Sequence, residues 1–261
     1  MQDLSNENVI HVKTPDVEYI QFRRLLEFKE LVHCYTLRVN DLNFTPGATI
    51  IPSNKRICNA LNLDYMNVVK PIQKHTGIVK SIDKVEKTMD LDNIDGLITN
   101  KKDIILSTIN ADCNLVIYYD PVKKVIANVH AGWRGVIQRI TAKAVEKMVN
   151  EFGCNTKDII CCICPGLRKC HFEVDYDVES IFREDYTYTG RIDEIVLPSE
   201  NQGKSKIDIT LVQKIILEEA GIKKENIIDS LLCSVCNKEK INSLRGNGHN
   251  SGQGAALITM H

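Results

Sequence analysis

The sequence predicts a single α+β domain, on three observations. The chain has 261 residues, which is enough for one large buried core. Segments with the apolar pattern of strands alternate with segments whose apolar residues have helical spacing. No internal repeat, low-complexity tract or compositional boundary divides residues 1–261. We therefore expect one domain in which helices and strands share a core.

Five strands are expected. Apolar and β-branched residues fill 104–109, 115–120 and 124–130, and a short turn with an Asp-Pro pair joins the last two. Two late segments, 227–235 and 255–260, are apolar enough to be strands as well. These segments predict the sheet part of the core.

Three helices follow from apolar residues at helical spacing. They run from 53 to 63, from about 135 to 152, and from Asp208 or Thr210 to 220. Ser53 is a candidate N-terminal cap, and a glycine follows each of the two later helices. The polar, mixed stretch 183–206 predicts a long surface connection.

Charge and hydropathy narrow the class of protein. The formal net charge is −1 with histidines neutral, which argues against a basic nucleic-acid-binding surface. The first residues lack the basic and apolar pattern of a secretory signal, and the apolar run 159–167 is too short to span a bilayer. We therefore expect a cytoplasmic protein without a membrane or nucleic-acid partner.

The stretch "VHAGWRGV" raises a chemical question. His130 ends a predicted strand, and a turn of small residues then holds Arg134 before a helix. Unpaired N–H groups at a helix start favour anions, and a guanidinium binds phosphate or carboxylate well. Gly132 and Gly135 would let a ligand approach the backbone. The alternative is a tight turn without a ligand, in which His130 finds its hydrogen-bond partners within the protein and the tryptophan packs on the core.

A cysteine and a second histidine suggest a metal site. Cys113 directly precedes the strand at 115–120, and His75 lies in a glycine-containing turn. With His130 they are too widely spaced for a zinc finger. They suit a catalytic zinc, which takes three protein ligands and leaves a fourth position open.

Several motifs in the right order resemble the YfiH-like, or laccase-domain, purine nucleoside phosphorylases. They are "QKHTGIV", the long block at 95–136 with its "ADC" and "HAGWRG" cores, "CPGLRKCHFEV", "KIDIT", and "CSVCNKEKINSLRGNG". The resemblance covers most of the chain. It implies a layered α/β/β/α fold with mixed sheets.

The resemblance also implies a zinc ion held by His75, Cys113 and His130. It implies phosphorolysis of adenosine, inosine and methylthioadenosine, together with deamination of adenosine, so that nucleoside and phosphate are the expected small-molecule partners. Copper is the less favoured metal, because the sequence lacks the His-x-His clusters of multi-copper sites.

Roles for other residues follow from the same resemblance and from their chemistry. Arg38, Arg134 and Arg245 are expected to bind phosphate. Asp112, beside Cys113, is expected to orient a histidine or transfer a proton, or else to cap a local turn. Cys170 is expected to face the substrate.

The sequence departs from the family near the expected substrate site. Gly246 and Gln253 stand where the family usually has arginines, and the glycine-rich segment expected after Arg38 is absent. The metal ligands are all present. The departures therefore concern the identity of the substrate.

Two other classes of function stay open. Cys113 with His75 or His130 could form a thiolate–imidazole nucleophile for hydrolysis of an amide or ester, as in the editing of cell-wall precursors. The chain could also be a non-enzymatic, cysteine-rich metal-binding protein, which predicts more than one bound zinc and no turnover.

The ten cysteines include a Cys-x-x-Cys pair, Cys233 and Cys236. This pair is interpreted as packing, with a redox pair or half of a structural zinc site as alternatives. Cys161 and Cys162 lie on a predicted strand and face opposite sides, so they should not complete such a site. Cys170 and His171 are also expected to face opposite sides of a strand.

Overall fold

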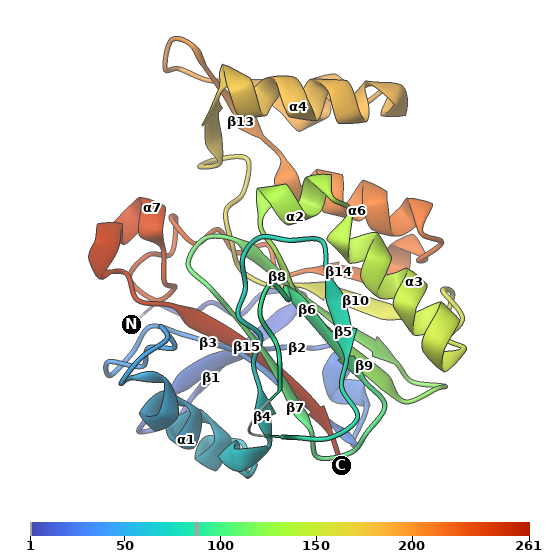
Figure 1. The fold of residues 1–261 in the computed structure, drawn as a ribbon. Coiled ribbons are helices and arrows are strands. Elements are labelled where there is room, and N and C mark those ends of the chain that lie inside the picture. The colour runs from blue at the N-terminus through green and yellow to red at the C-terminus, as the bar shows by residue number, and fades with distance from the viewer. Residues whose placement is uncertain (1, 87–88) are drawn as a thin grey trace.

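The computed structural model describes residues 2–86 and 89–261. Two six-stranded sheets pack face to face, and helices cover their outer faces (Figure 1). This is the layered α/β/β/α arrangement with mixed sheets that the sequence predicts. Among the described residues, no helix is long and apolar enough to cross a membrane.

The first sheet has the order β1-β2-β3-β15-β7-β4 and is antiparallel except for the β7–β4 pair. Its strands are β1 (Val9–Lys13), β2 (Glu18–Phe22), β3 (Leu31–Thr36), β4 (Val68–Val69), β7 (Ile105–Asn110) and β15 (Gly254–Met260). The predicted strands at 104–109 and 255–260 are thus confirmed, and they lie next to each other.

The second sheet has the order β14-β10-β8-β9-β6-β5, with parallel pairs at both edges. Its strands are β5 (Val79–Ser81), β6 (Gly96–Thr99), β8 (Asn114–Asp120), β9 (Val125–Ala131), β10 (Ile160–Ile163) and β14 (Ile227–Asp229). The predicted strands at 115–120 and 124–130 are its central antiparallel pair. The predicted strand at 227–235 is wrong beyond Asp229, where the chain leaves the sheet for a loop.

Alternation along β8 shows how the layers form. Leu115, Ile117 and Tyr119 point into the core between the two sheets, whereas Val116 and Tyr118 point to the core beneath the helices. Because successive side chains of a strand face opposite ways, a strand buried on both faces is apolar throughout. Cys161 and Cys162 of β10 likewise divide between these two cores, as expected.

The helices are α1 (Ile50–Ala60), α2 (Trp133–Ile137), α3 (Ile140–Phe152), α4 (Tyr176–Tyr186), α5 (Ile192–Ile195), α6 (Ile209–Glu219) and α7 (Leu244–Asn247). Helix α1 covers the outer face of the first sheet, and α3 and α6 cover that of the second. Asp208 caps α6, since its side chain accepts a hydrogen bond from the backbone of Leu211.

Three further expectations about elements are wrong. Ser53 lies inside α1, and its hydroxyl donates to the carbonyl of Asn43 rather than capping the helix. The helix predicted from 135 to 152 is broken at Arg139, which has a left-handed φ of 58°. The stretch 183–206 is structured and helps to form a third sheet, shown with α4 at one end of the molecule in Figure 1.

That third sheet has the order β11-β13-β12 and is antiparallel. Its strands are β11 (Glu173–Asp175), β12 (Val196–Pro198) and β13 (Lys204–Ile207). The sheet was not apparent from the sequence because its strands are only three or four residues long and lack a clear alternating pattern.

Candidate metal centre and pocket

The two central strands of the second sheet bring two candidate ligands together. Leu115 of β8 pairs with His130 of β9, and Asn114 pairs with Ala131. Cys113 comes directly before β8, so it lies beside the end of β9. At this point the chain crosses from β7 in one sheet to β8 in the other.

His75 reaches the same place from the loop between β4 and β5. The side chain of Gln73 fixes this loop to the end of β7, because it donates to the carbonyl of Ile109 and accepts from its N–H, both at 2.8 Å. His75 itself has a φ of 62°, a conformation that is uncommon for residues other than glycine. The loop is therefore held in one particular arrangement.

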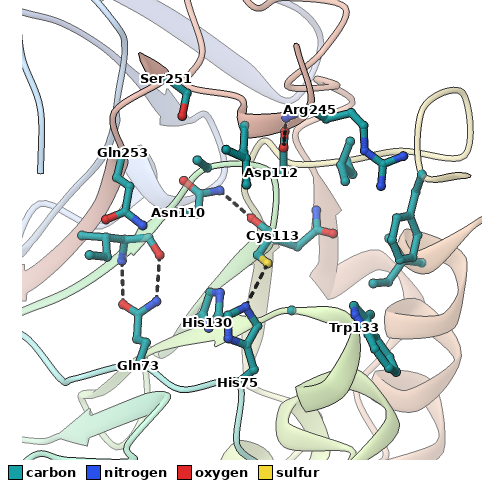
Figure 2. Close-up of a pocket in the computed structure, with 18 of the residues that line it drawn as sticks. Gln73, His75, Asn110, Asp112, Cys113, His130, Trp133, Arg245, Ser251 and Gln253 are labelled. Carbon is teal, nitrogen blue, oxygen red and sulfur yellow. Dashed lines mark hydrogen bonds between the residues drawn. The ribbon is translucent and has the colours of Figure 1, made fainter. Parts of the chain in front are cut away.

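The three side chains converge as the sequence predicts. The Sγ of Cys113 lies 3.7 Å from the Nε2 of His75, and the rings of His75 and His130 are 4.8 Å apart between centroids (Figure 2). One ligand atom from each residue lies within 4.8 Å of the others. Cys113, His75 and His130 are called the three-residue cluster below.

Asp95 orients this cluster and was missed by sequence reasoning. The Nδ1 of His130 donates to its carboxylate at 2.8 Å, and the backbone N–H groups of Lys74, His75 and Thr76 donate to it as well. Although burial opposes ionisation, these hydrogen bonds hold the pKa of Asp95 well below its usual range. Two signals in the sequence could have found it: Asp95 directly precedes buried strand β6, and it opens the family-like block at 95–136.

The histidines and the cysteine also shift one another's proton affinity. Burial raises the pKa of Cys113, but the charge of His130 and hydrogen bonds from both histidines outweigh this and bring the pKa to about 6. Burial lowers the pKa of His130, but Cys113 and Asp95 together raise the pKa to about 9. Both shifts favour the thiolate form of Cys113, the form that both a metal and a nucleophilic reaction need.

Gly132 leaves the space that the cluster needs. A Cβ at this position would lie 2.7 Å from the Cδ2 of His75 and 3.0 Å from the Sγ of Cys113. Any larger residue would therefore push two of the three ligands away. This explains the first glycine of "HAGWRG" without an appeal to a bound anion.

The donor set fits a zinc ion. Zinc–sulfur and zinc–nitrogen bonds of about 2.3 and 2.05 Å at a tetrahedral angle place S and N about 3.6 Å apart, close to the 3.7 Å between Cys113 and His75. Two imidazoles and a thiolate are ligands that zinc accepts, and Asp95 fixes the Nδ1 of His130 so that Nε2 is left for a metal.

The cluster lies at the wall of a cavity of about 960 Å³, a size suited to a small ligand. The cavity is lined by all three ligands and by apolar side chains that include Trp133, Leu167 and Phe172, as Figure 2 shows in part. Lys70, which the sequence did not single out, also lines it. Burial lowers the pKa of Lys70.

Asp112 does not orient either histidine, contrary to expectation. One carboxylate oxygen accepts from the hydroxyls of Ser234 and Ser243 at 2.7 and 2.5 Å, and the other accepts from the backbone N–H of Arg245 at 2.7 Å. Asp112 has a φ of 89° and is almost fully buried. It joins the loop before Cys113 to two later loops and so positions Cys113.

The three expected phosphate-binding arginines are placed differently. Arg245 lines the cavity, and its guanidinium donates to the carbonyl of Glu173 at 3.0 Å. Arg38 lines a neighbouring cavity of about 400 Å³, which shares Ser251 and Gly252 with the main one. The two cavities are therefore adjacent, with Arg245 at one and Arg38 at the other.

Arg134 lies at the rim rather than inside. Its exposed guanidinium is 4.3 Å from the centre of the Trp133 ring, and Trp133 itself lines the cavity. Helix α2 has only five residues and starts at Trp133. The anion site was expected at the start of a long helix, but the helix that starts here is much shorter than predicted.

Cys170 is not among the described residues that line the cavity. It lies in a turn before β11, where its Sγ is 3.2 Å from the Nδ1 of His171. The expectation that Cys170 and His171 face opposite sides of a strand is wrong, because this segment is not a strand. Both residues lie close to Cys233 and Cys236, a grouping that the interpretation of these two cysteines as packing residues did not anticipate.

Gln253 is placed at the site. It lines the main cavity (Figure 2), whereas Gly246 lies in the short helix α7. Of the departures expected from the resemblance, the one at Gln253 therefore lies within the pocket.

Comparisons with known proteins agree with this fold. The family described as multi-copper polyphenol oxidoreductase laccase matches residues 46–261. An adenosine deaminase RL5 from an unknown prokaryotic organism is 28% identical over 211 residues, which are 78% of this chain and 79% of that protein. A purine nucleoside phosphorylase of Clostridium acetobutylicum is 29% identical over 241 residues, 89% of this chain and 94% of the relative.

The mouse purine nucleoside phosphorylase LACC1 is 26% identical over 219 residues, 82% of this chain, but the match spans only 48% of that protein. Among solved structures, Bacillus licheniformis YfiH superposes with a TM-score of 0.86 at 22% identity, over 96% of this chain and 99% of the other. Geobacillus stearothermophilus YlmD superposes with a TM-score of 0.80 at 19% identity over the full length of both chains.

The fold and the site define a layered α/β protein with a Cys/His cluster able to hold a metal at the wall of a ligand-sized cavity. The chain belongs to the laccase-like family that includes the YfiH proteins.

Proposed function

We propose that this protein is a zinc-dependent purine nucleoside enzyme. It cleaves adenosine, inosine and methylthioadenosine with phosphate, and it deaminates adenosine. The observation that carries the proposal is the three-residue cluster at the wall of the 960 Å³ cavity. Relatives that are named purine nucleoside phosphorylase or adenosine deaminase supply the substrate class.

The cluster residues have separate tasks. His75, Cys113 and His130 would hold the metal, and Asp95 keeps His130 oriented toward it. A zinc ion there would supply a Lewis acid and the means to ionise water near neutral pH. The hydrogen bonds of Gln73 and Asp112 keep the loops that carry His75 and Cys113 in place, and both residues also line the cavity.

The rest of the cavity suits a nucleoside. Trp133, Leu167 and Phe172 provide an apolar wall against which a purine can lie. Arg245 and Lys70 provide positive charge inside the cavity for phosphate, with Arg38 in the adjoining one. Arg134 would contribute from the rim once its guanidinium turns away from Trp133.

A product analysis tests the proposal. The purified chain is supplied with zinc and incubated with adenosine or inosine, with and without inorganic phosphate. We expect free base and ribose 1-phosphate only when phosphate is present, and inosine with ammonia from adenosine in either case. A zinc-loaded protein that converts no purine nucleoside would contradict the proposal.

The low pKa of Cys113 favours a second candidate, hydrolysis by a Cys113–His130 nucleophile. Alkylation separates the two. A nucleophilic thiolate reacts with iodoacetamide in the protein as purified, whereas a zinc-bound thiolate reacts only after chelation. The third candidate, a non-enzymatic metal-binding protein, is distinguished by the absence of turnover.

A further inference from the structure

A second group of potential metal ligands lies in the loops that follow β10 and β14. It consists of Cys170, His171, Cys233 and Cys236, and one donor atom from each lies within 4.8 Å of the others. We call these four residues the four-residue cluster. None of them is among the described residues that line the main cavity, so the cluster is separate from the proposed active site.

The distances within the cluster match those between ligands of one zinc ion. At a tetrahedral zinc, two sulfurs lie about 3.8 Å apart, and sulfur and nitrogen lie about 3.6 Å apart. The sulfurs of Cys170 and Cys236 are 3.7 Å apart. The Nδ1 of His171 is 3.2, 3.5 and 3.4 Å from the sulfurs of Cys170, Cys233 and Cys236.

His171 distinguishes a metal site from a disulfide pair. A disulfide needs two sulfurs about 2.05 Å apart and no imidazole. Here a single ring nitrogen faces three thiols, an arrangement for which packing offers no reason, because three of the four side chains are at least partly exposed. Three thiolates and one imidazole are a common donor set of structural zinc sites.

The backbone holds the four residues in position. The N–H groups of His171 and Phe172 both donate to the carbonyl of Arg168, which forms the turn that lets neighbouring residues 170 and 171 point the same way. The carbonyl of Cys233 accepts from the backbone and side chain of Asn237, which closes the Cys-x-x-Cys loop.

We propose that the four-residue cluster binds a second zinc ion, whose function is structural. With all four positions taken by protein ligands, this ion has no open site for a substrate. It fastens the loop 166–172 to the loop 233–237. The proposal is independent of the reaction assigned to the three-residue cluster.

These two loops are hydrogen-bonded to the segment that carries Cys113 of the three-residue cluster. Ser234, next to Cys233, donates to the carboxylate of Asp112, and the N–H of Leu167 donates to the carbonyl of Asp112 at 2.6 Å. Gly166 packs so closely that a Cβ there would lie 2.8 Å from that same carbonyl oxygen. The second zinc therefore stabilises the loops that position Cys113.

Metal analysis of the full-length chain tests the proposal. We expect two zinc ions per chain in the wild type, one in Cys113→Ala, and one in the double variant Cys233→Ser/Cys236→Ser. Cys154→Ala, a buried cysteine outside both clusters, is the matched control and should keep two. A double variant that folds and keeps the full wild-type zinc content would overturn the proposal.

Cobalt substitution covers the case in which the double variant does not fold. Cys113→Ala loaded with cobalt should show the visible bands of a tetrahedral site and strong thiolate-to-metal absorption, since the four-residue cluster remains. Absence of these bands contradicts the proposal. So does mass spectrometry that finds a Cys170–Cys236 disulfide in the native protein isolated without reductant.

Discussion

The two Cys/His clusters differ in how the fold builds them. The three-residue cluster lies at the ends of central strands, and a cavity borders it. The four-residue cluster lies on two loops and encloses its centre with four donors. A site with three ligands leaves room for chemistry, whereas a site with four holds chain segments together. Under the two proposals above, the same kinds of ligand thus serve two purposes in one domain.

Positioning residues differ in the same way. Around the three-residue cluster, Asp95 and Gln73 fix the chain by side-chain hydrogen bonds to the backbone of His75 and Ile109. Around the four-residue cluster, backbone turns do this work. Asp112 and Ser234 connect the two regions at 2.7 Å. Variants that affect one region and spare the other therefore test the comparison.

Removal of Cys113 should have the largest effect. Cys113→Ala deletes the only thiolate of the three-residue cluster, and catalytic zinc contributes several kcal/mol to a transition state, so activity should fall about 1000-fold or more. Activity and zinc content are measured on one sample. Full zinc retention would show that Cys113 is not a ligand.

Replacement of Arg134 should affect one activity only. Loss of a charge-assisted contact of about 1.5–3 kcal/mol corresponds to roughly 10- to 150-fold in phosphate-dependent cleavage. Arg134→Ala should keep its zinc, and deamination should fall less because it does not use phosphate. Arg134→Lys should recover only part of the loss. A parallel loss of both activities and of thermal stability would instead indicate that Arg134 braces the turn through Trp133.

Replacement of Asp95 should weaken metal binding at one cluster. Asp95→Asn keeps the shape of the side chain but removes the charge that orients His130, which typically costs about 10- to 100-fold in metal affinity. Competition with a chelator measures this. The second zinc should be held as in the wild type, and equal weakening of both sites would refute separate positioning.

Replacement of Ser234 should have the smallest effect. Ser234→Ala removes one of two hydroxyls that donate to one Asp112 oxygen, which should lower the free energy of unfolding by about 1.5 kcal/mol. Denaturant titration measures it. Ser180→Ala, whose exposed hydroxyl bonds only to the carbonyl of Asp177, is the control and should change little.

Much of the fold could be predicted because the central strands are long, apolar and bounded by turns. Strands β7, β8 and β9 fall within a residue or two of their predicted positions. The break at Arg139 could not be predicted, because the helical spacing of apolar residues continues across it. Only the backbone conformation changes there, to the left-handed region. The third sheet depends on contacts between strands of three or four residues that leave no pattern.

The site was predictable in part for a similar reason. His75, Cys113 and His130 are residue types that bind metals and stand in motifs that resemble the family. Asp95 is the first residue of the family-like block at 95–136, but nothing in its local sequence indicates that its carboxylate reaches His130. The four-residue cluster depends on a turn at Cys170 and His171 and on a loop more than 60 residues later. Only the folded chain brings these segments together.

The most direct test of the account measures zinc content and nucleoside conversion on the same samples of two variants, Cys113→Ala and Cys233→Ser/Cys236→Ser. The account predicts that each variant loses one zinc ion per chain. Activity should be abolished in the first variant, while the second keeps measurable phosphate-dependent cleavage with a lower melting temperature. Full activity in Cys113→Ala, with activity lost only when the four-residue cluster is removed, would contradict it.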